Sequence, residues 1–600
     1  MPQFIDRHTL DFLLFDVLNV ENILGKGRYE DHEVESISSV MDLAQKIAEN
    51  DLWTHAEKSD VEEPYLDGDQ VKIVPEAIAG LRVMRDAGFF AAHCDYELGG
   101  MQLPVVVTHA CNGMLKGANI GTQSYMGLTR SAANALNAHA SDDIKQRYMM
   151  PMLEGRFFGT MCLSEPDVGS SLADIRTQAI PQDDGNYSIV GNKMWISGGD
   201  HEAAENIVHL VLARTPDASP GVKGLSLFAV PKFKVKDDGS LGDTNGVVVA
   251  GVNHKMGYRG TSNCLLSFGE KEPAIGQLVG ELGRGLFAMF LMMNEARISV
   301  GIGAAMLANV AYRIAVDYAK ERKQGRPLAD PDPMKSPVPI IEHPDVRRML
   351  LKQKAFSEGA IALCLYAGML VDYETLAGDK EERQHYSDLL DVLTPVVKAW
   401  PTEFGLEANK LAIQVLGGYG YARDFPVERL YRDNRLNSIH EGTNGIQALD
   451  LLGRKLVMND GRGLTALAKE IRNSIDELRG EAKVQSYSDT LLFLLKKLEV
   501  RAQETSSLLA QGERVAALAN ASPYLNAFGH MVIGWLWLQQ AVQALKALNS
   551  LEEGDEASFM RGKVSACRYF FEYELPEAEV WLQVSTNSPD VLVNLSEADF

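Results

Sequence analysis

Cysteine is scarce in this sequence, and no two cysteines are spaced to hold a metal ion together. The 600 residues include six cysteines and no CxxC pair. They are Cys94, Cys111, Cys162, Cys264, Cys364 and Cys567. Scattered cysteines are typical of reduced thiols in a reducing compartment, and they argue against a disulfide framework and a zinc site. We therefore expect no metal centre.

Long apolar runs are also missing. No stretch of about 18 uninterrupted apolar residues occurs, which argues against a spanning helix. The chain begins without a basic segment followed by an apolar run, so it does not match a signal peptide. A C-terminal stripe between Met531 and Leu545 has few basic neighbours, which favours helix–helix core over a membrane surface. We expect a cytoplasmic protein with no integral membrane segment.

Positive charge is outnumbered by negative charge. Lys and Arg total 58 against 81 Asp and Glu, a formal net charge of −23 at pH 7. Nucleic-acid binding depends on clustered Lys and Arg, so this balance disfavours a nucleic-acid partner. An anionic small molecule would still need individual basic residues at its site.

Several common catalytic motifs are absent. No GxGxxG follows a strand, and neither GxxxxGK[ST] nor GxSxG occurs. The sequence therefore gives little support to a Rossmann nucleotide site, a P-loop or a serine-hydrolase elbow. If a cofactor is bound, a different scaffold must hold it.

The apolar patterning divides the chain into four parts, because 600 residues exceed what one hydrophobic core holds. Helical periodicity surrounds a middle region of short β-rich runs separated by turn residues. We predict a mainly α fold with an inserted β domain. The predicted domains are an N-terminal helical domain (1–158), a middle β domain (159–280), a C-terminal helical bundle (281–460) and an additional helical domain (461–600).

The elements inside these parts follow from the same patterning. Five runs predict strands, at 187–190, 206–212, 225–230, 246–252 and 264–268. Four long segments predict helices, at 286–323, 342–377, 385–416 and 446–458. The prolines between 327 and 339 exclude a helix from the connection of the first two.

Two segments of the β domain carry ligand-binding chemistry. CLSEPDVGSS (162–171) is a strand followed by a proline-broken turn rich in hydroxyls, which exposes backbone N–H groups. GNKMWISGG (191–199) places Trp195 beside glycine-rich turns. A tryptophan in a short strand is most often core, but it is equally suited to wall a flat ring system.

Two further segments lie in the predicted bundle. QVLGGYGY (414–421) ends a helix in glycines, which permit close backbone approach. HEGTNG (440–445) precedes an apolar helix that Thr443 is suited to cap. The positive end of that helix would favour phosphate. Alone, Glu441 would more often be a solvated loop carboxylate.

Together these segments resemble the acyl-CoA dehydrogenase family, whose patterns read CxTEPxxGS, GxKxWITxG, QxxGGxG and YEGT. The resemblance covers roughly residues 75–460 and implies the family's fold, with a helical domain, a β-barrel-like middle domain and a four-helix bundle. It also implies FAD. Within the family, the chain is most similar to bacterial fatty acyl-CoA and methylmercaptopropionyl-CoA dehydrogenases, which carry an additional C-terminal helical domain.

Carried onto this sequence, the family's roles fall on matching residues. Glu441 is the implied catalytic base. The implied FAD contacts are Met161, Leu163, Ser164, Gly169, Ser170, Trp195, Ile196, Ser197, Arg322, Gln324, Gln414, Gly417, Gly418, Thr443 and Asn444. The implied substrate contacts are Ser170, Asn294, Arg297, Glu441 and Gly442. For Arg297, an ion pair within or between helices is an equally good reading.

Some positions depart from the family pattern. Ser164 and Ser197 stand where Thr is frequent, which keeps the hydroxyl. Gln324 runs directly into Gly325, without the usual intervening aromatic residue, and His440 replaces the usual Tyr. Arg322 is apt for phosphate, since a guanidinium donates in a fixed fork.

The resemblance implies a reaction and partners. Glu441 would remove the α-proton of an acyl-CoA, hydride would pass to flavin N5, and the product would be the trans-2-enoyl-CoA of β-oxidation. We expect electron-transfer flavoprotein as electron acceptor and a homodimer or higher homo-oligomer with FAD near the subunit interface. The alternatives are a methylmercaptopropionyl-CoA dehydrogenase, an acyl-CoA oxidase and a non-catalytic DNA-binding flavoprotein homologue.

Overall fold

The computed structural model describes residues 4–477 and 484–600, except for the side chains of residues 290–294 and Glu477. The chain forms two compact units, each described by itself. The first comprises Met1–Ser38, Pro104–Gly113 and Val300–Phe600, and the second comprises Ser39–Leu103 and Met114–Ser299. We call them the bundle unit and the sheet unit.

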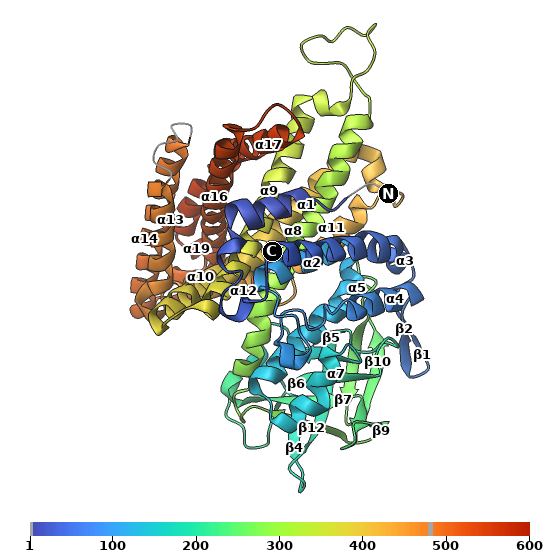
Figure 1. The fold of residues 1–600 in the computed structure, drawn as a ribbon. Helices are drawn as coiled ribbons and strands as arrows, with labels where there is room; N and C mark the ends of the chain where they lie inside the picture. The colour runs from blue at the N-terminus through green and yellow to red at the C-terminus, as the bar shows by residue number, and fades with distance from the viewer. Residues whose placement is uncertain (1–3, 478–483) are drawn as a thin grey trace. The chain divides into compact units, whose positions relative to one another are not determined.

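An eight-stranded sheet dominates the sheet unit (Figure 1). Its strands are β3 (Phe157–Cys162), β4 (Gln178–Pro181), β5 (Tyr187–Ser197), β6 (Asn206–Arg214), β7 (Leu225–Pro231), β10 (Val247–Val252), β11 (Asn263–Phe268) and β12 (Ala274–Val279). The main path runs β10-β11-β5-β12-β7-β6-β3, and β4 pairs with β5 and β6. Only β3 and β4 run parallel to β6. The predicted middle β region is confirmed.

The sheet is buried on both faces. Along β6, Val208, Leu210 and Leu212 belong to one hydrophobic cluster, while Val211 and Ala213 belong to another. This alternation follows from the two-residue period of a strand. The first cluster includes Ala132 and Leu136 of α5 (Val105–His139), and the second is lined by side chains of strands on its other face. A strand that is buried on both faces has a nearly continuous run of apolar residues, as the sequence of β6 does.

Helix α5 is broken at Asn119, where φ is −156° and ψ is 88°. The Asn119 side chain compensates locally: its Nδ2 donates to the Leu52 carbonyl at 3.2 Å, and its Oδ1 accepts from the Thr122 amide at 3.1 Å. A side chain inserted into the helical ladder is an established cause of a kink.

Long helices form the core of the bundle unit. They are α8 (Gly285–Glu321, of which the part from Val300 belongs here), α9 (Pro344–Leu376), α10 (Lys380–Leu416), α11 (Val427–Asn437) and α12 (Asn444–Asp450). All four predicted helical segments are confirmed within a few residues, although α12 gives way to a π-helical turn at Leu451–Lys455. The proline-rich connection between α8 and α9 stands out from the helix ends (Figure 1).

The C-terminal helices belong to the same compact unit as the bundle. They are α13 (Arg462–Glu477), α14 (Gln485–Ala510), α15 (Arg514–Leu518), α16 (Ala521–Leu548), α17 (Asp555–Tyr569), α18 (Glu577–Ser585) and α19 (Asp590–Val593). Trp400 of α10 donates from Nε1 to His530 Nδ1 of α16 at 2.9 Å. A Cβ at Gly529 would lie 2.3 Å from Trp400 Cδ1, so the glycine permits this close packing. Burial lowers the pKa of His530 to about 3, which keeps its ring neutral.

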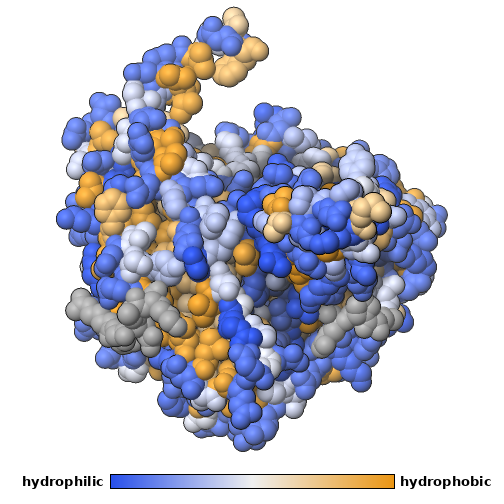
Figure 2. All heavy atoms as spheres, turned by 90° about the horizontal axis from the view of Figure 1, so that it is seen from above, coloured by the Kyte–Doolittle hydropathy of each residue, from blue (hydrophilic) through white to orange (hydrophobic). Residues whose placement is uncertain are grey.

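Among the residues that the structure describes, two helices, Glu295–Glu321 and Pro344–Leu376, are long and apolar enough to span a membrane by composition. Their most apolar windows are 83% and 89% buried, which is the pattern of core helices. Hydrophilic side chains cover most of the face shown in Figure 2, with smaller hydrophobic areas between them.

A buried ionic cluster joins three elements of the bundle unit. Lys563 of α17 donates to Glu358 of α9 at 2.8 Å and to Thr9 of α1 (Arg7–Asp11) at 3.0 Å. Lys563 and Glu358 have no exposed side-chain surface. Lys354 lies 2.5 Å from the other Glu358 oxygen. Glu358 is thus held between two ammonium groups away from water.

Breaking this cluster should destabilise the bundle unit. Lys563→Met removes one of the two ammonium groups that hold the buried Glu358, together with the donor to Thr9, and we expect a loss of about 3 kcal/mol in the free energy of unfolding. Lys497→Met removes an exposed pair with Glu579 at 3.3 Å and should cost less than about 1 kcal/mol. Urea unfolding of both variants measures the difference, and equal losses would contradict the cluster's role.

Candidate active site

The turn after β3 is held by a buried carboxylate. Glu165 accepts from the Arg176 amide at 2.8 Å, the Thr177 amide at 2.9 Å and the Thr177 hydroxyl at 2.6 Å. Lys193 of β5 lies 3.0 Å from Glu165 and also donates to the Leu163 carbonyl at 3.0 Å. Burial opposes the charge on Glu165, but Lys193 and the surrounding donors outweigh it and hold the pKa of Glu165 below its ordinary value.

The contacts of Glu165, which we call the Glu165 brace, hold the predicted ligand-binding turn at the surface. Gly169 and Ser170 are exposed, and a Cβ at Gly169 would meet nothing within 4 Å. The Ser164 carbonyl accepts from the Met194 amide at 3.0 Å. The structure therefore brings the turn and the tryptophan segment side by side within the sheet unit.

Trp195 is exposed, not core. Its backbone has φ +64°, in the left-handed region, and 59% of its surface is accessible. The register between β11 and β5 shifts at this point, between the Ile196–Cys264 and Lys193–Leu266 pairs. A bulge leaves an extra residue unpaired and re-aims its side chain. The sequence left open whether Trp195 is core or walls a ring, and the core reading is wrong.

Ser197 lies beside Trp195 at the end of β5. Its Oγ accepts from Asn263 Nδ2 at 3.1 Å. Because that contact uses an oxygen lone pair, the hydroxyl proton remains for another acceptor. The neighbouring Ile196 side chain is buried in a sheet core, so only its backbone is placed to meet a ligand.

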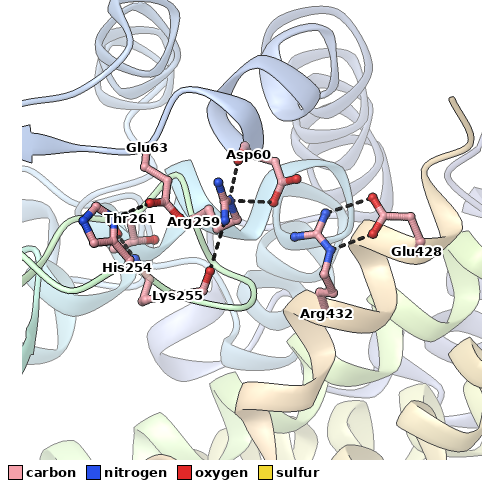
Figure 3. Close-up of polar contacts among 8 residues, drawn as sticks. All are labelled: Asp60, Glu63, His254, Lys255, Arg259, Thr261, Glu428 and Arg432. Atoms are coloured by element: carbon pink, nitrogen blue, oxygen red, sulfur yellow. Dashed lines mark hydrogen bonds and ion pairs between the residues drawn. The ribbon is translucent and has the colours of Figure 1, made fainter. Parts of the chain in front are cut away.

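The loop between β10 and β11, which leads to Asn263, is tied to the end of α3 (Ala56–Val61) and to the segment that follows it (Figure 3). Arg259 Nη1 lies 2.8 Å from Glu63, and Arg259 Nε donates to the Asp60 carbonyl at 2.5 Å. His254 lies 2.7 Å from the second Glu63 oxygen. These contacts fix the loop that positions the amide next to Ser197.

In the bundle unit, Glu441 follows α11 in a strained conformation. Its φ is +55° and that of Gly442 is +85°. Gln447 Nε2 donates to the Glu441 carbonyl at 3.2 Å and to the Gly442 carbonyl at 3.3 Å. Thr443 accepts from the Ile446 amide at 3.3 Å, which confirms the predicted N-cap of α12. Left-handed backbone at a non-glycine residue persists only where its surroundings over-determine it.

Asn444 anchors this loop to α10. Its Oδ1 accepts from Lys398 Nζ at 3.1 Å and from the Thr402 hydroxyl at 3.0 Å. Its Nδ2 donates to Glu403 at 3.0 Å. Lys398 is fully buried. Sequence reasoning missed Lys398, although one signal was available: it is a lone charge in an apolar stretch of α10.

Before the loop, α11 carries an ion pair of its own, also drawn in Figure 3. Arg432 contacts Glu428 through Nε at 2.6 Å and Nη2 at 2.9 Å. Such bidentate pairs one helical turn apart support the helix that leads into the loop.

The remaining predicted cofactor residues of this unit share one surface. Arg322 stacks over the Tyr419 ring at 5.7 Å and donates to Gln324 at 3.5 Å. Gly417 ends α10 with φ +62°, and a Cβ at Gly417 or Gly418 would meet nothing within 4 Å. Gln414, Gly417 and Gly418 are exposed. A guanidinium beside bare backbone is suited to an anionic ligand.

Three predicted residues of the sheet unit remain. Met161 and Leu163 pack partly against a sheet core. Arg297 is buried, at 3% exposure, and its role stays a prediction. The side chain of Asn294 lies outside the described part of the chain.

Comparison with known proteins shows the family to which the chain belongs. Four family models match in order: "Acyl-CoA dehydrogenase, N-terminal domain" at residues 35–156, "middle domain" at 160–270, "C-terminal domain" at 283–456, and "Acetyl-CoA dehydrogenase C-terminal like" at 467–596. The 3-methylmercaptopropionyl-CoA dehydrogenase of Ruegeria pomeroyi is 37% identical over 517 residues, 85% of each chain. The chain belongs to the acyl-CoA dehydrogenase family.

Other family members match over nearly the whole length. The broad-specificity linear acyl-CoA dehydrogenase FadE5 of Mycobacterium tuberculosis is 34% identical over 98% of each chain. The solved structure of Caenorhabditis elegans ACDH-11 in complex with C11-CoA has a TM-score of 0.78 and 18% identity, covering 99% of this chain and 95% of that one. The predicted family and fold class are confirmed. The assignment of individual site residues stays a prediction.

The Glu165 brace generates a pH-dependent prediction. Because the folded-state pKa of Glu165 lies below its ordinary value of 4.5, the carboxylate stabilises the fold above that pH. This contribution is lost as the pH falls through the folded-state pKa. Glu165→Gln should cost about 3 kcal/mol at neutral pH, and the gap to wild type should shrink below pH 4.5.

Thermal unfolding of wild type and variant at neutral and acid pH measures this gap. Glu202→Gln, which breaks a partly exposed pair with Lys72, is the matched control and should have a small effect. A gap that stays constant with pH would contradict an ionised Glu165.

The anchoring of the Glu441 loop generates a second prediction. Lys398→Met removes a charged donor from Asn444, and the amides of residues 441–446 should exchange hydrogen roughly tenfold faster. Mass spectrometry of the corresponding peptide measures the exchange rate. Lys410→Met on the same helix, where an exposed lysine pairs with Glu407, should leave the rate unchanged.

Proposed function

We propose that this chain is an FAD-dependent acyl-CoA dehydrogenase that converts a straight-chain fatty acyl-CoA into the trans-2-enoyl-CoA, with Glu441 as the base. The observation that carries the proposal is the strained Glu441 loop, held by Gln447 and Asn444 in a chain of this family. A carboxylate kept in a costly backbone conformation is expected at a functional site.

The residues of the sheet unit fit a flavin. An exposed tryptophan ring, a serine with an unused hydroxyl proton and an open turn with exposed amides suit a flat ring that carries polar atoms. Trp195, Ser197, Ser164 and Ser170 would hold it. In the bundle unit, Arg322 and the backbone at Gly417 and Gly418 would meet phosphate or adenine groups. FAD, when bound, supplies the acceptor for hydride leaving the β-carbon.

Glu441 performs the proton step. The α-proton of a thioester is weakly acidic, so a carboxylate removes it only when the developing enolate oxygen is stabilised. The Glu441 backbone N–H is the proposed donor. One proton then goes to the Glu441 carboxylate, and the β-hydrogen leaves with its electron pair, which yields the trans double bond. The Gln447 and Asn444 contacts hold the backbone of the loop that carries this carboxylate.

Partners follow from the same chemistry. We propose that the two electrons pass to electron-transfer flavoprotein and that the chain acts as a homodimer or higher homo-oligomer. The exposed Arg322, Gln414 and Gly417 surface is the part we expect to contact the FAD of a neighbouring subunit. Rapid peroxide formation in air would instead favour an acyl-CoA oxidase.

A second substrate has a specific observation in its favour. The relative that is 37% identical acts on 3-methylmercaptopropionyl-CoA. This thioester presents the same α- and β-hydrogens, so the proposed base would serve both substrates. Flavin reduction by fatty acyl-CoAs of graded length and by 3-methylmercaptopropionyl-CoA would rank them.

The role of Glu441 is tested by Glu441→Gln. The amide has nearly the shape of the carboxylate but is no base, so the variant should bind FAD and lose flavin reduction by at least about a thousandfold. Stopped-flow absorbance under anaerobic conditions measures the rate. Glu403→Gln, which changes a neighbouring carboxylate that only accepts from Asn444, should retain most of the activity. Substantial turnover by Glu441→Gln would refute the assignment.

A further inference from the structure

A continuous line of buried amide side chains connects α8 to His440. Asn409 of α10 donates from Nδ2 to the Leu307 carbonyl of α8 at 3.0 Å, and its Oδ1 accepts from Asn434 Nδ2 of α11 at 2.6 Å. Asn434 Oδ1 accepts from Asn437 Nδ2 at 3.0 Å, and Asn437 Oδ1 lies 3.1 Å from His440 Nε2. The three asparagines are fully buried. We call them the amide ladder.

The contacts with α8 determine which atom of each amide faces the next residue of the amide ladder. Backbone carbonyls only accept, so the atoms of Asn409 and Asn434 that face them must be amino groups. Asn434 Nδ2 also lies 3.2 Å from the Ala304 carbonyl, so two separate carbonyls orient the ladder. A Cβ at Gly405 of α10 would lie 3.2 Å from the Ala304 oxygen and 3.4 Å from Asn434 Nδ2, so this glycine leaves room for the contact.

Each amide then orients the next. Because the amino group of Asn434 faces α8, its Oδ1 faces Asn437. Asn437 must therefore donate from its amino group. Asn437 therefore turns Oδ1 toward His440. A carbonyl oxygen 3.1 Å from a ring nitrogen forms a hydrogen bond with it only if that nitrogen carries a proton.

We propose that the amide ladder makes Asn437 a positioning residue that holds His440 as the Nε2–H tautomer, next to the base. In the neutral ring Nδ1 is then the acceptor. The His440 backbone amide also donates to the Leu436 carbonyl at 3.2 Å, so ring and backbone are both tied to α11. Glu441 enters its left-handed turn directly from this fixed residue. The catalytic consequence rests on the proposed function, whereas the tautomer does not.

A ring locked in one tautomer gives the loop a single hydrogen-bonding pattern. A histidine that exchanged tautomers would present a donor and an acceptor in turn at Nδ1, in the residue directly before Glu441. The amide ladder fixes one tautomer of His440 with neutral side chains, so the ladder itself places no charge beside Glu441.

The direct test is 15N NMR of protein labelled at histidine, with the His440 signals assigned by their loss in His440→Asn. Wild type should show a protonated Nε2 and an unprotonated Nδ1. In Asn437→Leu the acceptor is gone, and the two nitrogens should move toward an averaged, mixed-tautomer position. In Asn437→Gln the side chain keeps an amino group for Asn434 and an oxygen that accepts from Nε2–H without adding charge, so the wild-type tautomer should return.

Activity provides the second readout. Asn437→Leu should slow flavin reduction roughly tenfold, the effect of one lost buried hydrogen bond, with KM little changed, and Asn437→Gln should recover most of the loss. Asn309→Leu on α8 is the control, because Asn309 is fully buried and neither of its amide atoms has a hydrogen-bond partner. It should leave tautomer and rate unchanged.

The possible results distinguish failure of the amide ladder from failure of the proposed function. An Nδ1–H tautomer in wild type would overturn the proposal, as would an Asn437→Leu variant that keeps a pure Nε2–H ring. Gln and Leu variants with the same NMR shifts would also overturn it, because they would leave Asn437 a merely structural role. A protein that shows the tautomer but reduces no flavin would support the ladder and refute the proposed function.

Discussion

The structure depends on holding two side chains in backbone conformations that ordinary residues avoid. Trp195 and Glu441 both have φ near +60°, where a side chain costs on the order of 1–3 kcal/mol. A bulge between β5 and β11 imposes the first conformation, and the Gln447 and Asn444 contacts impose the second. The surrounding fold has to supply enough rigid contacts to keep both.

Each unit does this with a buried polar group that braces a loop from behind. In the sheet unit, Glu165 gathers three donors from residues 176 and 177 and pairs with Lys193 on the neighbouring strand. In the bundle unit, Lys398 and Thr402 hold the Asn444 amide. Breaking one member of a buried network leaves its partners unsatisfied, so these networks fix geometry more than they add stability.

Much of the architecture was predictable because its signals are local. A continuous apolar run predicts a doubly buried strand such as β6, and the prolines after Arg326 exclude a helix from the α8–α9 connection. The Thr443 cap followed from residue type and position alone. The short strands β8 (Phe233–Val235) and β9 (Leu241–Thr244) were not predicted, since each offers too few residues for a period to show.

The site was less predictable because its supports come from distant parts of the chain. Nothing local to Lys398 shows that it meets Asn444, 46 positions later. Asn409, Asn434 and Asn437 look like ordinary polar residues until two carbonyls of α8 give them a direction. The exposure of Trp195 likewise depends on a bulge that only the pairing with β11 creates.

The most direct test of the account is an anaerobic titration of the purified protein with a straight-chain acyl-CoA. The account predicts a yellow protein whose flavin absorbance bleaches as one equivalent of trans-2-enoyl-CoA forms per FAD reduced. A colourless protein that takes up no FAD would contradict it, and so would a flavoprotein that no acyl-CoA thioester bleaches.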